Sequence, residues 1–318
     1  MIGLIALLAT APGLSLAQPI DCVVGADCLI QQYADHDPGA GASDYRCRHE
    51  TYDGHDGTDF RLPDKQAQAR GVAVLAAAGG VVTARRDGEP DFAVGAFDAR
   101  LVKDDKACGN GVVIRHAGGW ETQYCHMRQG SVSVRIGQVV RTGDRLGLVG
   151  QSGDAAFVHL HLSVRHDGKA VDPFGPEATC RPAAGLNASL WRADARARLA
   201  YRDVAVLNAG FAAAAVTMED IERGGIVPPR RSSPALTVYV RAIALRRGDV
   251  QSLVLSGPDG EMARSEAPPL DRDKAQYEMF VGKTRTGAAW PAGGYRGVYT
   301  VTRAGVPVLS KAITGSLN

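Results

Sequence analysis

The sequence predicts an all-β protein in which antiparallel sheets form two units. Short runs rich in β-branched residues, several of them ended by glycine, extend from Gly71 to about Pro173. Alternating strand-like runs return from 233 to 318, after a stretch of different composition. The 318 residues also exceed what one typical core holds, so we expect two domains.

The first 17 residues have the pattern of a signal peptide. An apolar run from Ile2 to Leu8 is followed by the small residues Ser15 and Ala17, which have the −3 and −1 spacing of a cleavage site. No Lys or Arg precedes the run, and a buried N-terminal strand or helix is the alternative. The run is too short to span a membrane, and no later segment could do so. We therefore expect cleavage after Ala17, a periplasmic or secreted protein, and no stable membrane insertion.

Six cysteines suit an oxidising compartment, where an even number indicates disulfides rather than buried free thiols. Cys108 precedes one strand of a hairpin predicted over 110–126, and Cys125 closes the other strand. The two positions are roughly opposite, so we expect a Cys108–Cys125 bond. Two further bonds are expected, without a predicted pairing, among the remaining four cysteines: Cys22, Cys28, Cys47 and Cys180.

Composition changes after residue 178. Residues 179–232 read as a linker with short helices, one of which should begin at Thr217. From 233 to 318, alternating runs joined by turns predict a small immunoglobulin-like β-sandwich. The whole chain has 36 Lys and Arg against 34 Asp and Glu, which offers no broad basic face for nucleic acid.

Histidines and an aspartate recur in three separate short motifs. In a strand, His159 and His161 would share one face while the leucines between and after them enter the core. His55 and Asp59 lie in a glycine-rich loop, and imidazole and carboxylate are good zinc ligands. His126 ends a predicted hairpin strand. Each motif alone is a weak indication of a metal site.

Taken in order, the motifs resemble a known family. The chain carries HDGTD at 55–59, then GNGVVIRH, YCHM, a glycine-punctuated run from 134 to 153, HLH and DPF. This order resembles the lysostaphin-type (LytM-like) zinc endopeptidases over roughly residues 45–175. Asp154 to Val158 departs from the family, which often has a Thr- and Gly-rich run there.

The resemblance implies a zinc endopeptidase domain over 18–178, with an antiparallel sheet of the duplicated hybrid motif type. It implies one zinc ion per chain held by His55, Asp59 and His161, with His126 and His159 as catalytic histidines. The implied reaction is hydrolysis of peptide cross-links in cell-wall peptidoglycan, with peptide stems as substrate. The C-terminal domain is expected to bind an unidentified protein or wall component, to shield the groove or to pack on the first domain.

Three protein ligands leave one zinc position open for water, as in catalytic sites. Zinc lowers the pKa of that water toward ~7. One neutral histidine would take the water's proton, and a protonated one would stabilise the oxyanion or the leaving amine. The roles of His126 and His159 stay open between these two. A near-neutral charge and the lack of a recognisable wall-binding repeat favour direct cross-links between a D-alanine and a diamino acid over glycine bridges.

Three other functions compete with this interpretation. A non-catalytic LytM-like module that activates other wall hydrolases typically lacks the metal ligands. A biotinyl or lipoyl carrier needs a lysine at a hairpin tip, but no lysine occurs between Lys106 and Lys169. A structural zinc site usually closes with four protein ligands. The remaining histidines are expected in loops (His36 and His49) or solvated at strand ends (His116 and His166).

Overall fold

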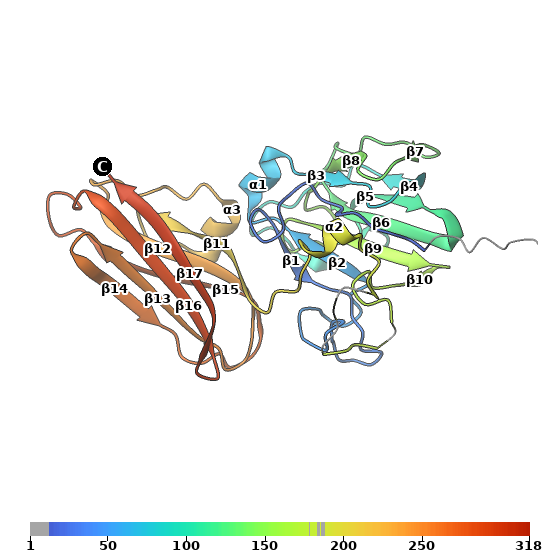
Figure 1. Cartoon of the computed structure of the whole chain (residues 1–318). Helices are drawn as coiled ribbons and strands as arrows, with labels where there is room; N and C mark the ends of the chain where they lie inside the picture. The colour runs from blue at the N-terminus through green and yellow to red at the C-terminus, as the bar shows by residue number, and fades with distance from the viewer. Residues whose placement is uncertain (1–12, 178, 183–184, 186–187) are drawn as a thin grey trace, which may run out of the picture.

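A computed structural model describes residues 13–177, 179–182, 185 and 188–318 of the chain. Residues 1–12 of the predicted signal peptide lie outside the described residues. In the described part, antiparallel sheets dominate and helices are short (Figure 1), which confirms the predicted fold class. None of the helices among these residues is long and apolar enough to cross a membrane.

The N-terminal part is built on one large antiparallel sheet. Its strands follow the order β1-β2-β9-β6-β5-β4-β7, with β10 paired to β9. A separate two-stranded sheet, β3 with β8, lies beside it. The strand bounds are β1 Leu29–Gln32, β2 Gly57–Arg61, β3 Ala73–Leu75, β4 Gly80–Arg86, β5 Asn110–Arg115, β6 Trp120–Met127, β7 Val139–Val140, β8 Arg145–Leu148, β9 His159–His166 and β10 Lys169–Ala170.

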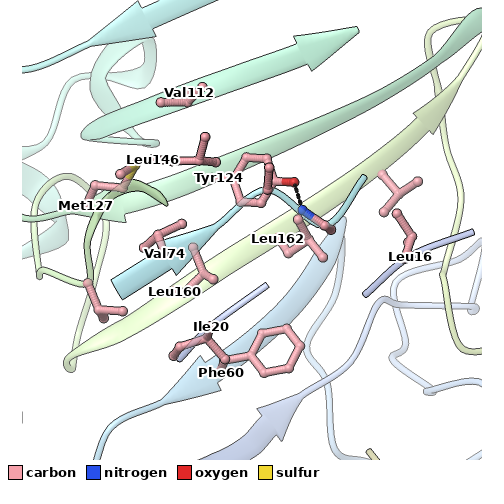
Figure 2. Close-up of a cluster of buried hydrophobic side chains, with 14 of the residues drawn as sticks. Leu16, Ile20, Phe60, Val74, Val112, Tyr124, Met127, Leu146, Leu160 and Leu162 are labelled. Atoms are coloured by element: carbon pink, nitrogen blue, oxygen red, sulfur yellow. Dashed lines mark hydrogen bonds between the residues drawn. The ribbon is translucent and has the colours of Figure 1, made fainter. Parts of the chain in front are cut away.

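The core of this part packs between the large sheet and the small one. Figure 2 shows Leu160 and Leu162 of β9 and Phe60 of β2 facing the same apolar cluster as Val74 of β3. The Tyr124 hydroxyl accepts the backbone N–H of Ala77 at 2.8 Å, which satisfies a polar group within the cluster (Figure 2). Leu160 and Leu162 are fully buried, so the alternation of β9 turns His159 and His161 to the opposite face.

Leu16 belongs to the same core, although it precedes the predicted cleavage site. Its side chain is fully buried. Its N–H donates to the carbonyl of Leu190, and its carbonyl accepts the N–H of Arg192, both at 2.8 Å. Cleavage after Ala17 would therefore remove a core side chain.

Three disulfides brace the N-terminal part. The predicted Cys108–Cys125 bond is confirmed, with a Cα–Cα distance of 4.8 Å. The other two bonds join Cys22 to Cys28 and Cys47 to Cys180. The second of these ties the loop before β2 to a residue 133 positions later in the chain.

The C-terminal part consists of two sheets over one apolar core. One sheet has the order β11-β12-β15 and the other β14-β13-β16-β17 (Figure 1). The bounds are β11 Ala205–Ala212, β12 Ala235–Leu245, β13 Val250–Gly257, β14 Gly260–Glu266, β15 Lys274–Thr284, β16 Gly293–Arg303 and β17 Val306–Leu317.

The stretch predicted as a linker, 179–232, contains strand β11. This strand pairs antiparallel with β12 from Ala205↔Ile243 to Ala212↔Thr237. The Ala-rich sequence has weak strand propensity, and pairing with a distant buried strand overrides it. The helix predicted to begin at Thr217 is confirmed, with Thr217 as its N-cap in a capping box. The helices are α1 Lys65–Arg70, α2 Ala193–Arg196 and α3 Met218–Arg223, with 3-10 turns η1 Ala99–Leu101, η2 Asp104–Lys106 and η3 Ala117–Gly119.

Candidate metal centre and groove

The side chains of His55, Asp59 and His161 converge on one point. Asp59 of β2 lies directly opposite His161 of β9 in the antiparallel ladder, and His55 reaches them from the loop before β2. Asp59 Oδ1 is 3.2 Å from His55 Nε2 and 2.9 Å from His161 Nδ1. The two imidazole nitrogens are 3.1 Å apart. All three residues are buried, and their ligand atoms lie within 4.8 Å of one another.

Hydrogen bonds on the far side of each ring fit these residues to a metal. The Nδ1 of His55 lies 2.6 Å from the carbonyl of Tyr33, which can only accept, so Nδ1 carries the proton. The Nε2 of His161 faces Asp56 Oδ1 at 3.1 Å and Ser163 Oγ at 2.9 Å. Both rings can thus present a lone pair toward Asp59, the arrangement that outer hydrogen bonds impose on metal-binding histidines. Two imidazoles and a carboxylate suit zinc.

His126 lies at the end of β6, beside this cluster. Its backbone φ of 60° falls in the left-handed region that non-glycine residues rarely adopt. Its N–H donates to the carbonyl of Cys108 at 2.8 Å, and its Nδ1 donates to the carbonyl of Ser152 at 2.8 Å. The unusual backbone and both bonds aim Nε2 away from the backbone, toward the other rings.

His159 starts β9 and lies next to His126, with ring centroids 4.6 Å apart. Its Nδ1 donates to the carbonyl of Phe157 at 2.9 Å, and its Nε2 is 3.5 Å from Asp59 Oδ1. His126 and His159 therefore hold the same tautomer, with a proton on Nδ1 and an acceptor on Nε2. The structure brings all five predicted site residues together on one side of the large sheet.

Burial and neighbouring charges set the protonation of the cluster. Burial lowers the pKa of His126 and of His159, and the neighbouring histidines lower that of His126 further. Burial alone would raise the pKa of Asp59, but His159 and His55 hold it well below its usual range. Burial opposes the charge on His161, yet hydrogen bonds to Asp56 and Asp59 raise its pKa to about 9. Asp59 thus stays charged beside the neutral rings of His126 and His159, while His161 carries a proton that a bound metal would displace.

Asp56 is a residue of this site that sequence reasoning missed. Besides His161, it accepts from Ser163 Oγ at 3.2 Å and from Arg165 Nη2 at 3.0 Å. The hydrogen bond to His161 lowers the pKa of Asp56 most, and the charges of His161 and Arg165 and the hydrogen bond from Ser163 lower it further, although partial burial opposes them. Residues 161, 163 and 165 alternate along β9 on one face, so the period-2 pattern could have indicated this row.

A groove opens beside the cluster. Its lining includes the half-exposed Tyr52, whose ring centroid lies 4.5 Å from that of His55. The loop that ends at Cys108 forms one wall, and Gln123 and Asp154 also contribute. A chain segment in this groove would lie against Asp56, His126 and His161.

One histidine prediction is wrong. His116 is buried rather than solvated, because Gly79 and Thr122 close over it. Its Nδ1 lies 2.8 Å from the Gly79 carbonyl and its Nε2 lies 2.9 Å from Thr122 Oγ. His36 lies in a loop as expected, but its side chain is largely covered, and its Nε2 lies 2.9 Å from Oδ2 of Asp172.

The exposed His166 stacks on Trp120 at a centroid distance of 4.2 Å. His49 is exposed and lies in a bend outside the groove. Neither residue approaches the cluster, in agreement with the expectation that they lie at the surface.

Comparison with known proteins supports a peptidase. Residues 53–173 match the family model described as Peptidase family M23. The DD-carboxypeptidase/endopeptidase Mpg of Neisseria meningitidis serogroup B is 33% identical over 146 residues, which are 44% of this chain and 28% of that protein. The peptidoglycan DD-endopeptidase ShyA of Vibrio cholerae is 30% identical over 118 residues, 37% of this chain and 22% of that protein.

Among solved structures, a zinc containing peptidase from Vibrio cholerae is similar at 23% identity. The match covers 50% of this chain and 39% of that one, with a TM-score of 0.33. The chain spans less than a third of the length of the two curated relatives. The sheet, the cluster and the family match define a peptidase domain. More specifically, residues 53–173 form an M23 domain of the LytM-like family, as the motifs indicated.

Proposed function

We propose that this protein is a zinc-dependent endopeptidase that hydrolyses peptide cross-links of cell-wall peptidoglycan. One observation carries the proposal: four imidazoles of one buried cluster can each turn an acceptor nitrogen inward, around a single carboxylate. Two of these nitrogens and Asp59 suffice to hold a metal, which leaves the other two imidazoles for proton transfer. A purely structural site would have no use for the second pair.

In this mechanism His55, Asp59 and His161 would hold one zinc ion. Bound zinc would supply Lewis-acid polarisation of the scissile carbonyl and an acidified water. His126 and His159 have Nε2 free to accept a proton, because backbone carbonyls occupy Nδ1 in both. Once protonated, either ring can donate from Nε2 to a developing oxyanion or to the leaving amine.

The proposed substrate is the direct cross-link between a D-alanine and a diamino acid. The names of the two relatives, one a DD-carboxypeptidase/endopeptidase and one a peptidoglycan DD-endopeptidase, support this class over glycine bridges. The proposed location is the periplasm or the exterior, after removal of a signal peptide. Three disulfides suit such an oxidising compartment.

The test pairs metal content with hydrolysis on the same samples. We expect His161→Ala to lose most of its zinc by elemental mass spectrometry. His126→Ala and His159→Ala should keep zinc and lose ~10²–10⁴-fold in peptide release from purified sacculi. His166→Ala is the matched control, since it is an exposed histidine on the same strand, and it should change neither measurement.

Sacculi with direct cross-links and sacculi with glycine bridges, compared by product mass, would identify the bond. Full zinc and full activity in both His126→Ala and His159→Ala would overturn the endopeptidase. Zinc binding by the wild type without hydrolysis of either wall would favour a non-catalytic activator of other hydrolases.

A further inference from the structure

Arg61 is a fully buried arginine close to the candidate metal centre. It follows Asp59 by two residues on β2, so its side chain leaves the same face of the strand. In the ladder it lies directly opposite His159. Burying an unpaired guanidinium costs free energy of folding. The partners of Arg61 therefore indicate its role.

The charge partner of Arg61 comes from the C-terminal part of the chain. Its Nη2 lies 3.0 Å from Oε2 of Glu222 on helix α3, and its Nη1 donates to Gln31 of β1. The same carboxylate oxygen of Glu222 also binds Arg241 of β12, which is fully buried too. Among these contacts, the carboxylate of Glu222 thus forms ion pairs with the buried guanidinium groups of both Arg61 and Arg241.

Arg241 anchors this cluster to the N-terminal part as well. Its Nη2 donates to the carbonyl of Pro63, two residues beyond the end of β2, and its Nε donates to Asn208 Oδ1 at 2.9 Å. The position of α3 relative to β2 is therefore fixed by charge-assisted hydrogen bonds from both sides.

On its other side Arg61 contacts the residue that orients His159. The guanidinium carbon lies 4.2 Å from the centroid of the Phe157 ring, in cation–π geometry. The carbonyl of Phe157 accepts a hydrogen bond from Nδ1–H of His159, and the ring centroids of Phe157 and His159 are 4.7 Å apart. Phe157 lies in the segment 154–158, where the sequence departs from the family pattern.

We propose that Glu222 is a positioning residue for His159, acting through Arg61 and Phe157. The C-terminal sandwich would then be part of the catalytic unit rather than an independent appendage. Without the carboxylate, Arg61 and Arg241 lose the charged partner that they share, and Arg61 moves away from Phe157. This inference rests on the proposed function, because it gives His159 its catalytic consequence.

The first test compares Glu222→Gln with Glu219→Gln, an exposed glutamate on the same helix. Because a misplacement near 1 Å can cost ~10²-fold in rate, we expect kcat of Glu222→Gln to fall about 10-fold or more. KM and bound zinc should stay near wild type, and Glu219→Gln should match wild type throughout. Glu222→Asp, which keeps the charge, should recover part of the lost kcat. A lower Tm with unchanged kcat at 25 °C would overturn the proposal.

A double-mutant cycle tests the route through Phe157. Phe157→Leu keeps apolar volume but removes the ring, and it should lower kcat on its own. If Glu222 acts through Phe157, the double variant should be no worse than the poorer single variant. Additive losses would overturn the route. If Glu222→Gln does not fold, the same cycle measured with Glu222→Asp and Phe157→Leu tests whether Glu222 acts through Phe157.

Histidine side-chain NMR on the wild type and both glutamine variants separates this inference from the proposed function. The ring signals of His159 should shift in Glu222→Gln and not in Glu219→Gln. If the wild type hydrolyses no wall material but these signals shift, the proposed endopeptidase activity is wrong, whereas the positioning of His159 by Glu222 is supported. Unchanged signals in a folded Glu222→Gln would refute the positioning.

Discussion

The carbonyl oxygen of Cys108 accepts the backbone N–H of His126 at 2.8 Å. Cys108 is itself bonded to Cys125, the residue before His126. The disulfide and the hydrogen bond together hold His126 in its left-handed backbone conformation, which persists only where the surroundings enforce it. The Cys108–Cys125 disulfide therefore helps to position His126 beside the groove, in addition to stabilising the fold.

We predict that Cys108→Ser/Cys125→Ser loses both stability and activity. Opening a loop of 17 residues should lower the free energy of unfolding by roughly 3 kcal/mol. Hydrolysis of sacculi should fall at least several-fold, because His126 is no longer restrained. Zinc should remain, since neither cysteine is a ligand. Denaturant unfolding, hydrolysis and elemental analysis measure the three quantities.

Cys22→Ser/Cys28→Ser is the control for this experiment, since that bond does not line the groove. It should lower stability and leave hydrolysis unchanged at temperatures where the chain is folded. Wild-type hydrolysis by Cys108→Ser/Cys125→Ser would show that His126 does not need the disulfide.

A second prediction concerns Asp56, which accepts a hydrogen bond from Nε2 of His161, the ring nitrogen that faces away from Asp59. We expect Asp56→Asn to weaken zinc binding about 10–100-fold, as losing such partners typically does. Competition with a chelator of known affinity gives the dissociation constant. Asp53→Asn changes an exposed carboxylate of the same loop and should bind zinc like the wild type. Equal affinities for both variants would remove Asp56 from the site.

The sequence could predict the metal cluster because its residues lie in short motifs. His159 and His161 share a face by strand alternation, and HDGTD brings a histidine and an aspartate within one loop and strand. Asp56 was within reach of the same argument. Glu222 was not, since it meets Arg61 across 161 positions and no local pattern specifies that pairing. Strand β11 and the burial of His116 likewise depend on segments that come from elsewhere in the chain.

Leu16 gives a third prediction about the N-terminal segment. Leu16→Ala should lower the free energy of unfolding by ~2–5 kcal/mol, as for other fully buried leucines. Val23→Ala, at a side chain that is 60% exposed, should have little effect. A chain that starts at Gln18 should also be less stable than one that starts at Gly13. Equal urea midpoints for these two chains would mean that the contacts of Leu16 contribute little.

Glu50 predicts how stability depends on pH. It is a buried carboxyl near Arg246, whose Nη2 lies 3.7 Å from its Oε1. Burial raises the pKa of Glu50 from 4.5 to about 8, against the lowering effect of Tyr201 and Arg246. The folded chain therefore holds a proton that the unfolded chain releases between these two values.

Unfolding in that window releases the proton, so the free energy of unfolding should fall as pH rises from 4.5 to about 8 and level off above it. Glu50 should account for a decrease on the order of a few kcal/mol in the free energy of unfolding over this window, since each pKa unit corresponds to about 1.4 kcal/mol. Glu50→Gln stays neutral at every pH and should lose less stability between pH 5 and 9 than the wild type. Glu266→Gln, an exposed control, should follow the wild-type curve. Urea denaturation at several pH values measures the curves, and parallel curves for Glu50→Gln and wild type would show that Glu50 is already ionised in the folded chain.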